Sequence, residues 1–195
     1  MTLCDGDNAD LTNLQRQIVH RSDSVGINKT VSASVTLAAI NPEVEVVAVA
    51  HRLHGAELEE RVAEADVVLD CSDNFATRHA INRACVTQRK ALVSGAAIRF
   101  DGQVAAFDLR DSSSPCYACL FPESGENEET RCAVMGVFAP LVGIIGSVQA
   151  CEALKLLIGA GRTLNGRLQM FNALNMEWHA VRLGKDPACL VCAAA

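Results

Sequence analysis

Short apolar runs alternate with helix-like segments through the first two thirds of the chain. Thr2 to Cys4 is a short strand pattern, and Val44 to Ala50 and Ala65 to Asp70 are patterned as longer strands, the last of them buried. Asn28 to Ile40 and Ala56 to Ala65 have helical spacing instead, and the first of these helices is expected to stop at Asn41-Pro42 because proline disfavours it. Strands that alternate with helices predict an α/β fold with parallel strands.

The pattern changes after residue 90. A turn at Cys71 to Asn74 and a helix to about Gln88 lead into a buried strand, Ala91 to Ser94. Ala96 to Phe100 and Gln103 to Asp108 then predict a hairpin that turns at Asp101-Gly102, since Asp-Gly is a strong hairpin signal.

A second antiparallel pair is predicted at Arg167 to Phe171 and Trp178 to Leu183. The fold class is therefore α/β: a doubly wound Rossmann-like sheet with antiparallel C-terminal strands. With 195 residues and 50% hydrophobic content, the chain can bury one substantial core, so we expect a single domain over residues 1–195.

One apolar stretch, Ala133 to Cys151, has no charged residue and approaches the length of a membrane span. It contains Pro140 and several glycines, and it continues into Glu152 and Lys155 in the same helical pattern. A helix that is apolar all round also suits the centre of a globular core. We therefore expect a core helix over Pro140 to Gly159 and no membrane association.

Charge and the N-terminus narrow the function classes. The chain has 17 basic and 23 acidic residues, a net charge of −6, which gives no general attraction for nucleic acid or anionic lipid. Met1 to Asp5 has neither a basic region nor an apolar signal core. The expected compartment is the cytoplasm.

Candidate chemistry lies at the ends of the strands, where open α/β sheets bind ligands. Asp5 is placed to take ribose hydroxyls, or it is only a turn or cap residue. Asp73 follows the Ala65 to Asp70 strand, where it would bind Mg2+ beside phosphates or would only cap the next helix. Arg16 and Lys29 are available for phosphates, and both can equally be solvated charges.

The chain has nine cysteines, and two C-x2-C pairs stand out, at 116–119 and 189–192. Four thiolates are a ligand set that zinc prefers. The gap between the pairs is too long for a zinc ribbon, so the residues alone leave a redox pair or unrelated buried thiols as alternatives.

A glycine-rich phosphate loop, which normally opens a nucleotide-binding α/β domain, does not precede Asp5 in this sequence. We expect that a first strand, phosphate loop and first helix are missing, so that the fold is N-terminally truncated. A misassigned start, a truncated gene and a fragment remain equal explanations.

The order of several motifs resembles the sulfur-carrier-protein adenylyltransferases, bacterial relatives of ubiquitin-activating enzymes that serve molybdopterin and thiamine synthesis. The resemblance spans essentially the whole chain and is slightly closer to the molybdopterin-synthase branch, on Val93 to Arg99 and Val142 to Ser147. The motifs are Asp5-Gly6-Asp7, Leu11 to Gln17, Gly26 to Lys29, Ile40-Asn41-Pro42, Asp70 to Asn74, Cys116 to Cys119 and Gly136 to Gly143.

This resemblance implies an ATP-dependent nucleotidyltransferase. It would adenylate the C-terminal carboxylate of a small ubiquitin-like sulfur carrier that ends in Gly-Gly, with release of pyrophosphate. Asp5 would take the ribose, Asp73 would bind Mg2+, and the phosphates would be held by Asn13, Arg16 and Lys29. No general base is needed, because the carboxylate is already ionised at pH 7.

Two cysteine assignments also follow from the resemblance. Cys116, Cys119, Cys189 and Cys192 would bind a structural zinc that staples the tail to the loop after Asp108. Cys132 would lie on a crossover loop and, in some branches, link covalently to the carrier; Arg131 beside it would lower the thiol pKa. The alternative for Cys132 is a small buried hydrophobe.

Family members carry roughly one more βαβ start, and this affects two expectations. A chain without it should expose apolar surface and form a homodimer or larger species. Its adenylation should also be impaired, because even one lost preorganised donor typically costs on the order of 100-fold in rate. The alternative function is a non-catalytic carrier-binding module that keeps the zinc.

Overall fold

The computed structural model describes residues 1–123 and 135–193, which form two compact units, Met1–His54 and Gly55–Ala195. Parallel pairing joins the two strands of the first unit and the first two strands of the second, and the later strands of the second unit are antiparallel. The predicted mixture of parallel strands and antiparallel C-terminal strands is confirmed. The single-domain assignment stays a prediction.

The first unit is small and its strands are short. Strand β1 (Thr2–Cys4) pairs with β2 (Val47–Val49), which is shorter than the predicted strand. Helix α1 (Lys29–Ile40) begins after Asn28, whose side chain accepts the N–H of Thr30 as an N-cap, and it ends before Asn41-Pro42 as predicted. Two short 3-10 helices, Leu11–Asn13 and Ser22–Ser24, lie between β1 and α1.

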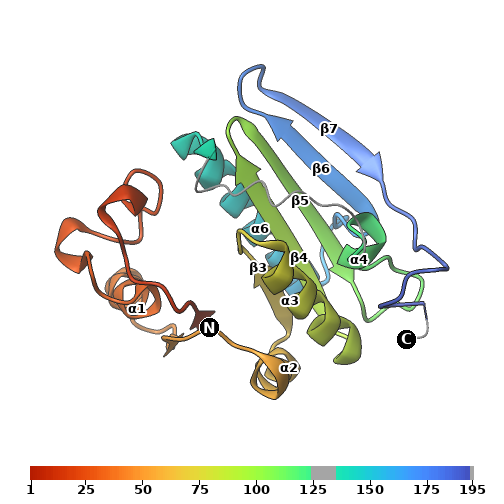
Figure 1. Ribbon diagram of the computed structural model, residues 1–195, viewed down its shortest axis with the longest axis horizontal. Coiled ribbons are helices and arrows are strands. Elements are labelled where there is room, and N and C mark those ends of the chain that lie inside the picture. Colours follow the sequence, from red (N-terminus) through yellow and green to blue (C-terminus); the bar gives the residue numbers. More distant parts are fainter. Residues whose placement is uncertain (124–134, 194–195) are drawn as a thin grey trace. The chain divides into compact units, whose positions relative to one another are not determined.

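The second unit is built on a five-stranded sheet in the order β3-β4-β5-β6-β7 (Figure 1). Its elements in chain order are α2 (Gly55–Glu64), β3 (Val67–Asp70), α3 (Phe75–Thr87), β4 (Ala91–Ile98), β5 (Asp101–Asp108), α4 (Tyr117–Leu120), α6 (Ala139–Ile158), β6 (Arg167–Asn172) and β7 (Glu177–Arg182). The predicted helices and strands of this unit are present with bounds shifted by a few residues, except that the two strands predicted at Ala91 to Ser94 and Ala96 to Phe100 form the single strand β4.

The hairpin turn differs from the prediction. Strand β4 continues to Ile98, which pairs with Asp101, so the turn consists of Arg99 and Phe100 and the Asp101-Gly102 pair lies inside β5. Arg99 adopts the left-handed conformation that the tight turn requires, at φ 50°. A Cβ on Gly102 would lie 2.5 Å from Ile145 Cδ1 of α6. This glycine therefore allows a helix to approach the sheet closely.

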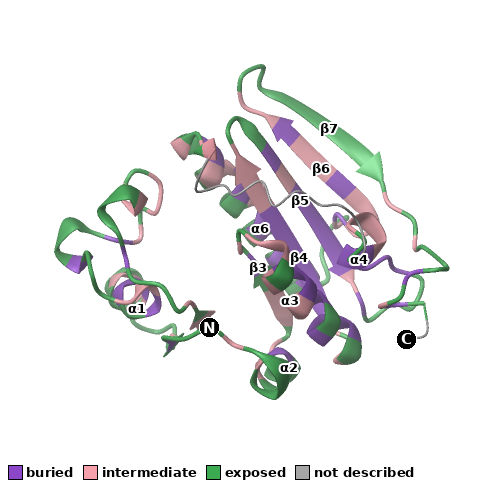
Figure 2. Ribbon diagram, viewed as in Figure 1, coloured by how far each residue is buried: buried purple, intermediate pink, exposed green. Residues whose placement is uncertain are grey.

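The core has two layers because side chains alternate across β4 and β5. Val93 and Val104 point to one face, where they pack with Leu141 and Ile145 of α6. Leu92 and Phe107 point to the other face and pack with residues of α3 and α4. In Figure 2 the buried residues accordingly concentrate on β4 and β5, whereas β7 is exposed throughout.

Helix α6 is long and apolar enough to cross a membrane by length and composition. In this fold it packs against β3, β4 and β5, and Gln149 and Glu152 are buried on it. Pro140 lies in its first turn, and Gly159 ends it in the left-handed conformation at φ 64°. These contacts are those of the core helix that the sequence predicts.

Candidate functional site

Two carboxylates and two cations gather at the end of β1. Lys29 Nζ lies 3.6 Å from Asp5 Oδ2 and 3.3 Å from Asp7 Oδ2, and Arg52 donates to Asp7 Oδ1 at 3.0 Å. The Arg52 hydrogen bond lowers the pKa of the Asp7 carboxyl against a smaller opposing effect of burial, and Lys29 adds to the lowering. The structure thus brings together Asp5 and Lys29, two of the predicted nucleotide-binding residues.

Backbone contacts explain why these charges meet. The Asn28 side chain donates to the carbonyls of Asp5 (2.9 Å) and Asp7 (3.1 Å), and the N–H of Lys29 donates to the Asp7 carbonyl (2.9 Å). The start of α1 is therefore tied to the segment after β1. Asp5 also accepts the N–H of Asp7 at 2.9 Å, so the turn role weighed for Asp5 is present alongside its ion pair.

Asn13 and Arg16 lie on the segment around the first 3-10 helix. Asn13 Oδ1 accepts the N–H of Asp10 at 3.0 Å, and Arg16 donates to the carbonyl of Thr12 at 3.3 Å. Both contacts stabilise this segment locally.

His20 is buried against α1. One ring nitrogen, Nδ1, lies 2.9 Å from the hydroxyl of Ser32. Burial lowers the pKa of His20, with a further lowering from Lys29 and an opposing effect of Asp5. The Asp5 and Lys29 charges therefore act on His20 in opposite directions.

Asp73 of the second unit stands exposed between β3 and α3. The cap of α3 is Asn74, whose side chain accepts the N–H of Thr77 at 2.8 Å. Asp73 receives a long hydrogen bond from the Asn74 amide, at 3.4 Å. The capping role considered for Asp73 thus belongs to its neighbour, and the Asp73 carboxylate is open to solvent at a helix N-terminus.

A buried ionic network holds the loop that carries Asp73. Asp70 Oδ1 accepts the N–H and the hydroxyl of Ser72, at 3.0 and 2.6 Å, and Asp70 Oδ2 accepts the hydroxyl of Ser94 at 3.0 Å. Arg78 donates to Ser94 Oγ and to the Gly95 carbonyl, each at 3.1 Å, and also to the Ser72 carbonyl. Its guanidinium lies 3.6 Å from Asp70.

Gln149 of α6 contacts the same ends of β3 and β4 from the other face of the sheet. Its amide donates to the carbonyls of Asp70 (3.0 Å) and Val93 (3.3 Å), and its oxygen accepts from the Cys71 thiol at 3.7 Å. Gln149 lies where a side chain on Gly95 would stand, so Gly95 makes room for the Gln149 side chain. Sequence reasoning missed this network, although Arg78 within the apolar pattern of α3 was a detectable signal.

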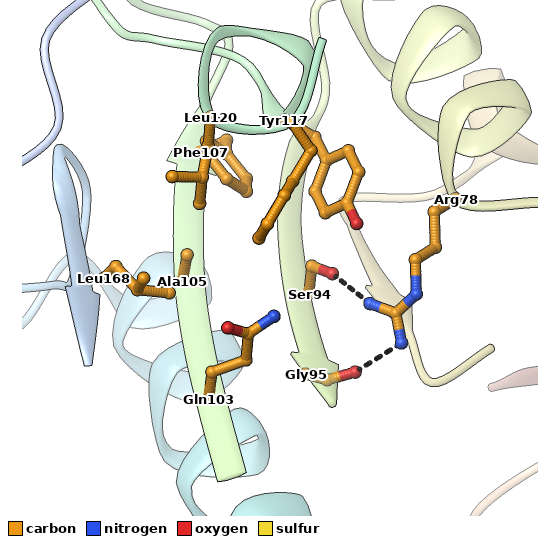
Figure 3. Close-up of a pocket in the computed structure, with 10 residues that line it drawn as sticks. Arg78, Ser94, Gly95, Gln103, Ala105, Phe107, Tyr117, Leu120 and Leu168 are labelled. Carbon is orange, nitrogen blue, oxygen red and sulfur yellow. Dashed lines mark hydrogen bonds between the residues drawn. The ribbon is translucent and has the colours of Figure 1, made fainter. Parts of the chain in front are cut away.

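A shallow pocket opens on the face of the sheet that α6 does not cover (Figure 3). Arg78, Ser94 and Gly95 form its polar end, whereas Phe107 and Tyr117 lie at its apolar end. Burial raises the pKa of the Tyr117 hydroxyl. The pocket is small, and it combines an apolar wall with hydrogen-bonding atoms at one end.

The four predicted zinc ligands converge although about 70 residues separate the pairs in the chain. Distances between Sγ atoms are 3.7 Å for Cys116 and Cys189, 3.4 Å for Cys119 and Cys192, and 4.0 Å for Cys116 and Cys119. All four Sγ atoms lie within 4.8 Å of one another. Tetrahedral zinc with bonds near 2.3 Å separates its sulfurs by about 3.8 Å, so the cluster has the dimensions of a metal centre.

The C-terminal segment reaches this cluster through polar contacts. Lys185 donates to the carbonyl of Ser112 at 2.8 Å, and the N–H of Asp186 donates to Cys119 Sγ at 3.5 Å. These hydrogen bonds of the protein itself join the tail to the loop after Asp108, whereas the expected attachment through zinc stays a prediction. Cys132, the remaining candidate, lies outside the described residues.

Comparisons with known proteins agree along the whole chain. The ThiF family model matches residues 1–191. The chain is 44% identical over 192 residues to the molybdopterin-synthase adenylyltransferase of Escherichia coli (strain K12), covering 98% of this chain and 76% of that enzyme. It is 38% identical over 192 residues to the sulfur carrier protein ThiS adenylyltransferase of the same strain, covering 98% of this chain and 75% of that protein.

Solved structures support the fold. The chain superimposes on E. coli MccB, crystallised with MccA-N7isoASN, with a TM-score of 0.82 at 22% identity; the match covers 98% of this chain and 59% of MccB. The Rossmann-like fold is thereby confirmed, and so is the resemblance to sulfur-carrier adenylyltransferases. On its sequence, its motifs and its fold, the chain belongs to the ThiF family.

Proposed function

We propose that this chain adenylates the C-terminal Gly-Gly carboxylate of a small ubiquitin-like sulfur-carrier protein. The observation that carries the proposal is the match over 98% of the chain to enzymes that are named for this kind of activity. The molybdopterin pathway is the preferred assignment, since identity is 44% to that relative and 38% to the thiamine one. A cytoplasmic location fits this role and stays a prediction.

The reaction joins two anions. A carboxylate oxygen of the carrier attacks the α-phosphorus of ATP, and the bond from that phosphorus to the bridging oxygen breaks, so that pyrophosphate leaves. The protein must neutralise phosphate charge and hold the carboxylate in line. Lys29 suits the first task, because its ammonium already lies among carboxylate oxygens at 3.3 to 3.6 Å, which phosphate oxygens would replace.

The remaining residues of the first unit have proposed roles consistent with their contacts. Asp5 takes the ribose hydroxyls, which suits a half-exposed carboxylate at a strand end. Arg16 and Asn13 contact phosphate. The Arg16 bond to the Thr12 carbonyl is local and can be exchanged for a ligand, whereas Asn13 accepts from Asp10 through Oδ1, so its Nδ2 is the atom that would donate to phosphate.

Asp73 is the proposed Mg2+ ligand. Its carboxylate is exposed and is not used as a helix cap, and carboxylates are the side chains that bind Mg2+ beside substrate phosphates. When bound, Mg2+ neutralises charge on the leaving pyrophosphate. The network of Asp70, Arg78 and Gln149 keeps the Asp73 loop attached to the ends of β3 and β4.

The test is ATP–pyrophosphate exchange with a Gly-Gly-terminated carrier. Exchange is measured on the 195-residue chain and on a fusion that adds the glycine-rich start implied by the family resemblance. We expect exchange from the fusion, and the measurement on the chain alone shows whether these 195 residues suffice. In the fusion, Asp73→Ala should abolish exchange, whereas Asp66→Ala, at the other end of β3, should leave it unchanged.

Carrier binding separates the two functional hypotheses. Calorimetry that detects carrier binding, together with no exchange in the fusion, would favour the carrier-binding module. Undiminished exchange in the Asp73→Ala fusion would remove the metal-binding role. Cys132→Ala should not affect exchange, because no thiol takes part in adenylation; a covalent role of Cys132 would show only in later sulfur transfer.

We also propose that the four-cysteine cluster binds a structural Zn2+. The four sulfurs fit the ion in number, type and spacing, and their closest separation, 3.4 Å, is too long for a disulfide. Cys189→Ser combined with Cys192→Ser should release the metal and loosen the tail, whereas Cys4→Ser with Cys151→Ser, two exposed cysteines, should not. Full zinc occupancy in the first double variant would contradict the assignment.

Self-association is proposed from exposed apolar surface. Leu154, Leu157 and Ile158 of α6 are 58%, 50% and 71% exposed, and Val35 of α1 is 68% exposed. Contiguous apolar patches mark interaction surfaces, and Leu154, Leu157 and Ile158 lie within two turns of one helix. We expect a homodimer or larger species in sedimentation, and a stable monomer at micromolar concentration would contradict it.

A further inference from the structure

Asn82 of α3 is completely buried and lies between that helix and the first cysteine pair. Its Oδ1 accepts the N–H of Tyr117 at 2.9 Å, and its Nδ2 donates to Cys116 Sγ at 3.6 Å. One side chain therefore contacts both the sulfur of Cys116 and the backbone directly after it. None of the predicted site residues provides this contact.

The chemistry of the cluster gives this contact a purpose. A thiolate that binds a metal in a buried site retains negative charge, and an N–H donor stabilises that charge. Cys119 receives a comparable donor, the N–H of Asp186, at 3.5 Å. Each thiol of the first pair, Cys116 and Cys119, thus receives a hydrogen bond from an N–H group outside the cluster. This arrangement is expected around thiolate ligands.

The two bonds of Asn82 also constrain geometry. Cys116 is the N-cap residue of α4, so the Tyr117 N–H is an end group that the helix itself leaves without a partner. By accepting it, Asn82 holds the start of α4 in place, and by donating to Cys116 it orients the sulfur. A residue that only filled space would need neither polar atom.

We propose that Asn82 is a positioning residue of the four-cysteine centre, which orients Cys116 and sets the affinity of the centre for Zn2+. The inference rests on the proposed zinc site. It is tested on the whole 195-residue chain by metal binding, so that it does not depend on adenylation activity.

The informative variant is Asn82→Asp. Aspartate has nearly the same shape and keeps an oxygen for the Tyr117 N–H, but it replaces the donor toward Cys116 by an acceptor. We expect Zn2+ affinity, measured by competition with a chromophoric chelator, to fall about 10- to 100-fold, as losses of outer contacts typically do. The absorption bands of the Co2+-substituted protein should also shift, because the sulfur field around the ion changes.

Two further variants make the result decisive. Asn74→Asp places the same substitution on the same helix, at its N-cap, where aspartate caps as well as asparagine, so metal affinity should not change. Asn82→Leu removes both polar contacts and should weaken the metal as well. Circular dichroism of each metal-free variant, compared with the metal-free wild type, identifies variants that fail to fold.

The outcomes separate the two proposals. A wild-type chain that binds no Zn2+ overturns the zinc proposal and the inference with it. A wild-type chain that binds Zn2+, with folded Asn82→Asp and Asn82→Leu variants that bind it within twofold of wild type, overturns the role of Asn82 alone.

Discussion

Acidic and basic side chains meet in both units, but at very different depths. In the first unit the side chains of Asp7 and Arg52 are 50% and 63% exposed, and Lys29 is the least exposed member of the group at 17%. In the second unit Asp70 and Arg78 are 1% and 8% exposed and are surrounded by further hydrogen bonds. The same ionic chemistry therefore serves two purposes.

The degree of burial determines which role an ion pair has. A buried ion pair has lost its hydration, so it persists only if every charge is compensated, and it then holds one loop geometry. A half-exposed pair contributes little to stability and can exchange its partners for those of a ligand. The Asp70 and Arg78 network is suited to fixing the loop before α3, and the Lys29 group is suited to meeting phosphate.

The two units also differ in the side chains that they bury. In the first unit the buried residues are mostly small or polar, such as Ala33, Ser32 and Thr30. In the second unit two apolar clusters lie on opposite faces of β4 and β5. Hydrogen bonds hold the first unit in its local geometry, whereas close packing holds the second. Each of the following substitutions tests this difference.

The largest effect on stability is expected from Arg78→Met. Methionine retains most of the apolar volume but leaves Asp70 buried without its cation, and breaking a buried pair in this way typically costs about 3–5 kcal/mol. Urea unfolding gives the free energy. The control is Arg83→Met on the same helix, whose pair with Glu123 is half-exposed and should change the free energy by about 1 kcal/mol or less. Equal losses in both variants would show that depth does not matter.

Packing around glycine should produce the next largest effect. Gly102→Ala places a Cβ 2.5 Å from Ile145 and 2.9 Å from Leu141, inside the core, and overpacking of this kind costs about 1–3 kcal/mol. Gly6→Ala meets the exposed Arg52 side chain at 2.9 Å, which can move away, and the Arg52 backbone nitrogen at 3.2 Å, a tight contact that a small shift of the surface segment relieves. Its urea midpoint should therefore shift less than that of Gly102→Ala, and the reverse order would contradict the comparison.

Gly102 also shows which features of the fold can be predicted from the sequence and which cannot. The elements were predictable, because periodicity and caps such as Asn28 are local signals. The turn prediction was wrong, because Asp-Gly is a good turn pair but Gly102 serves contact with α6, and Asp101 bonds Asn172 of β6 at 2.8 Å. Contacts between distant segments override the local preference.

Candidate chemistry was predictable to a similar extent. The cysteine pairs were identified by spacing and resemblance, and the fold brings their sulfurs together. Arg78 and Asn82 were not identified, because both depend on tertiary neighbours. The contacts of Arg78 exist only because the pairing of β3 with β4 places Asp70 opposite Ser94. Those of Asn82 exist only because α4 lies beside α3. The proposed roles of the site residues stay predictions, for Asp5, Asn13, Arg16, Lys29, Asp73 and Cys132 alike.

A smaller effect on stability is expected from Lys29→Ala. Its ion pairs with Asp5 and Asp7 involve partly exposed carboxylates, and such pairs are worth about 0–1 kcal/mol. If Lys29 serves phosphate, the same variant should weaken ATP binding strongly. Thermal unfolding and nucleotide titration on one sample compare the two effects. A large loss of stability with unchanged nucleotide binding would make Lys29 a structural residue like Arg78.

The smallest effect is expected from the charge on Asp7. Its folded-state pKa is lowered, chiefly by Arg52, so the ionised carboxylate stabilises the fold above the unfolded-state pKa of about 3.9. This contribution is lost as the pH falls through the lower folded-state value.

Other carboxyls also titrate in this pH range, so the informative quantity is the difference in unfolding free energy between wild type and Asp7→Asn. That difference should stay constant above about pH 5 and shrink below about pH 4. Because Asp7 is half-exposed, salt should reduce it at every pH. Urea unfolding at pH 7, 5 and 3.5, with and without added salt, measures it. A difference that widens as the pH falls would mean that the pKa of Asp7 is raised, which would contradict the stabilising role of Arg52 and Lys29 beside it.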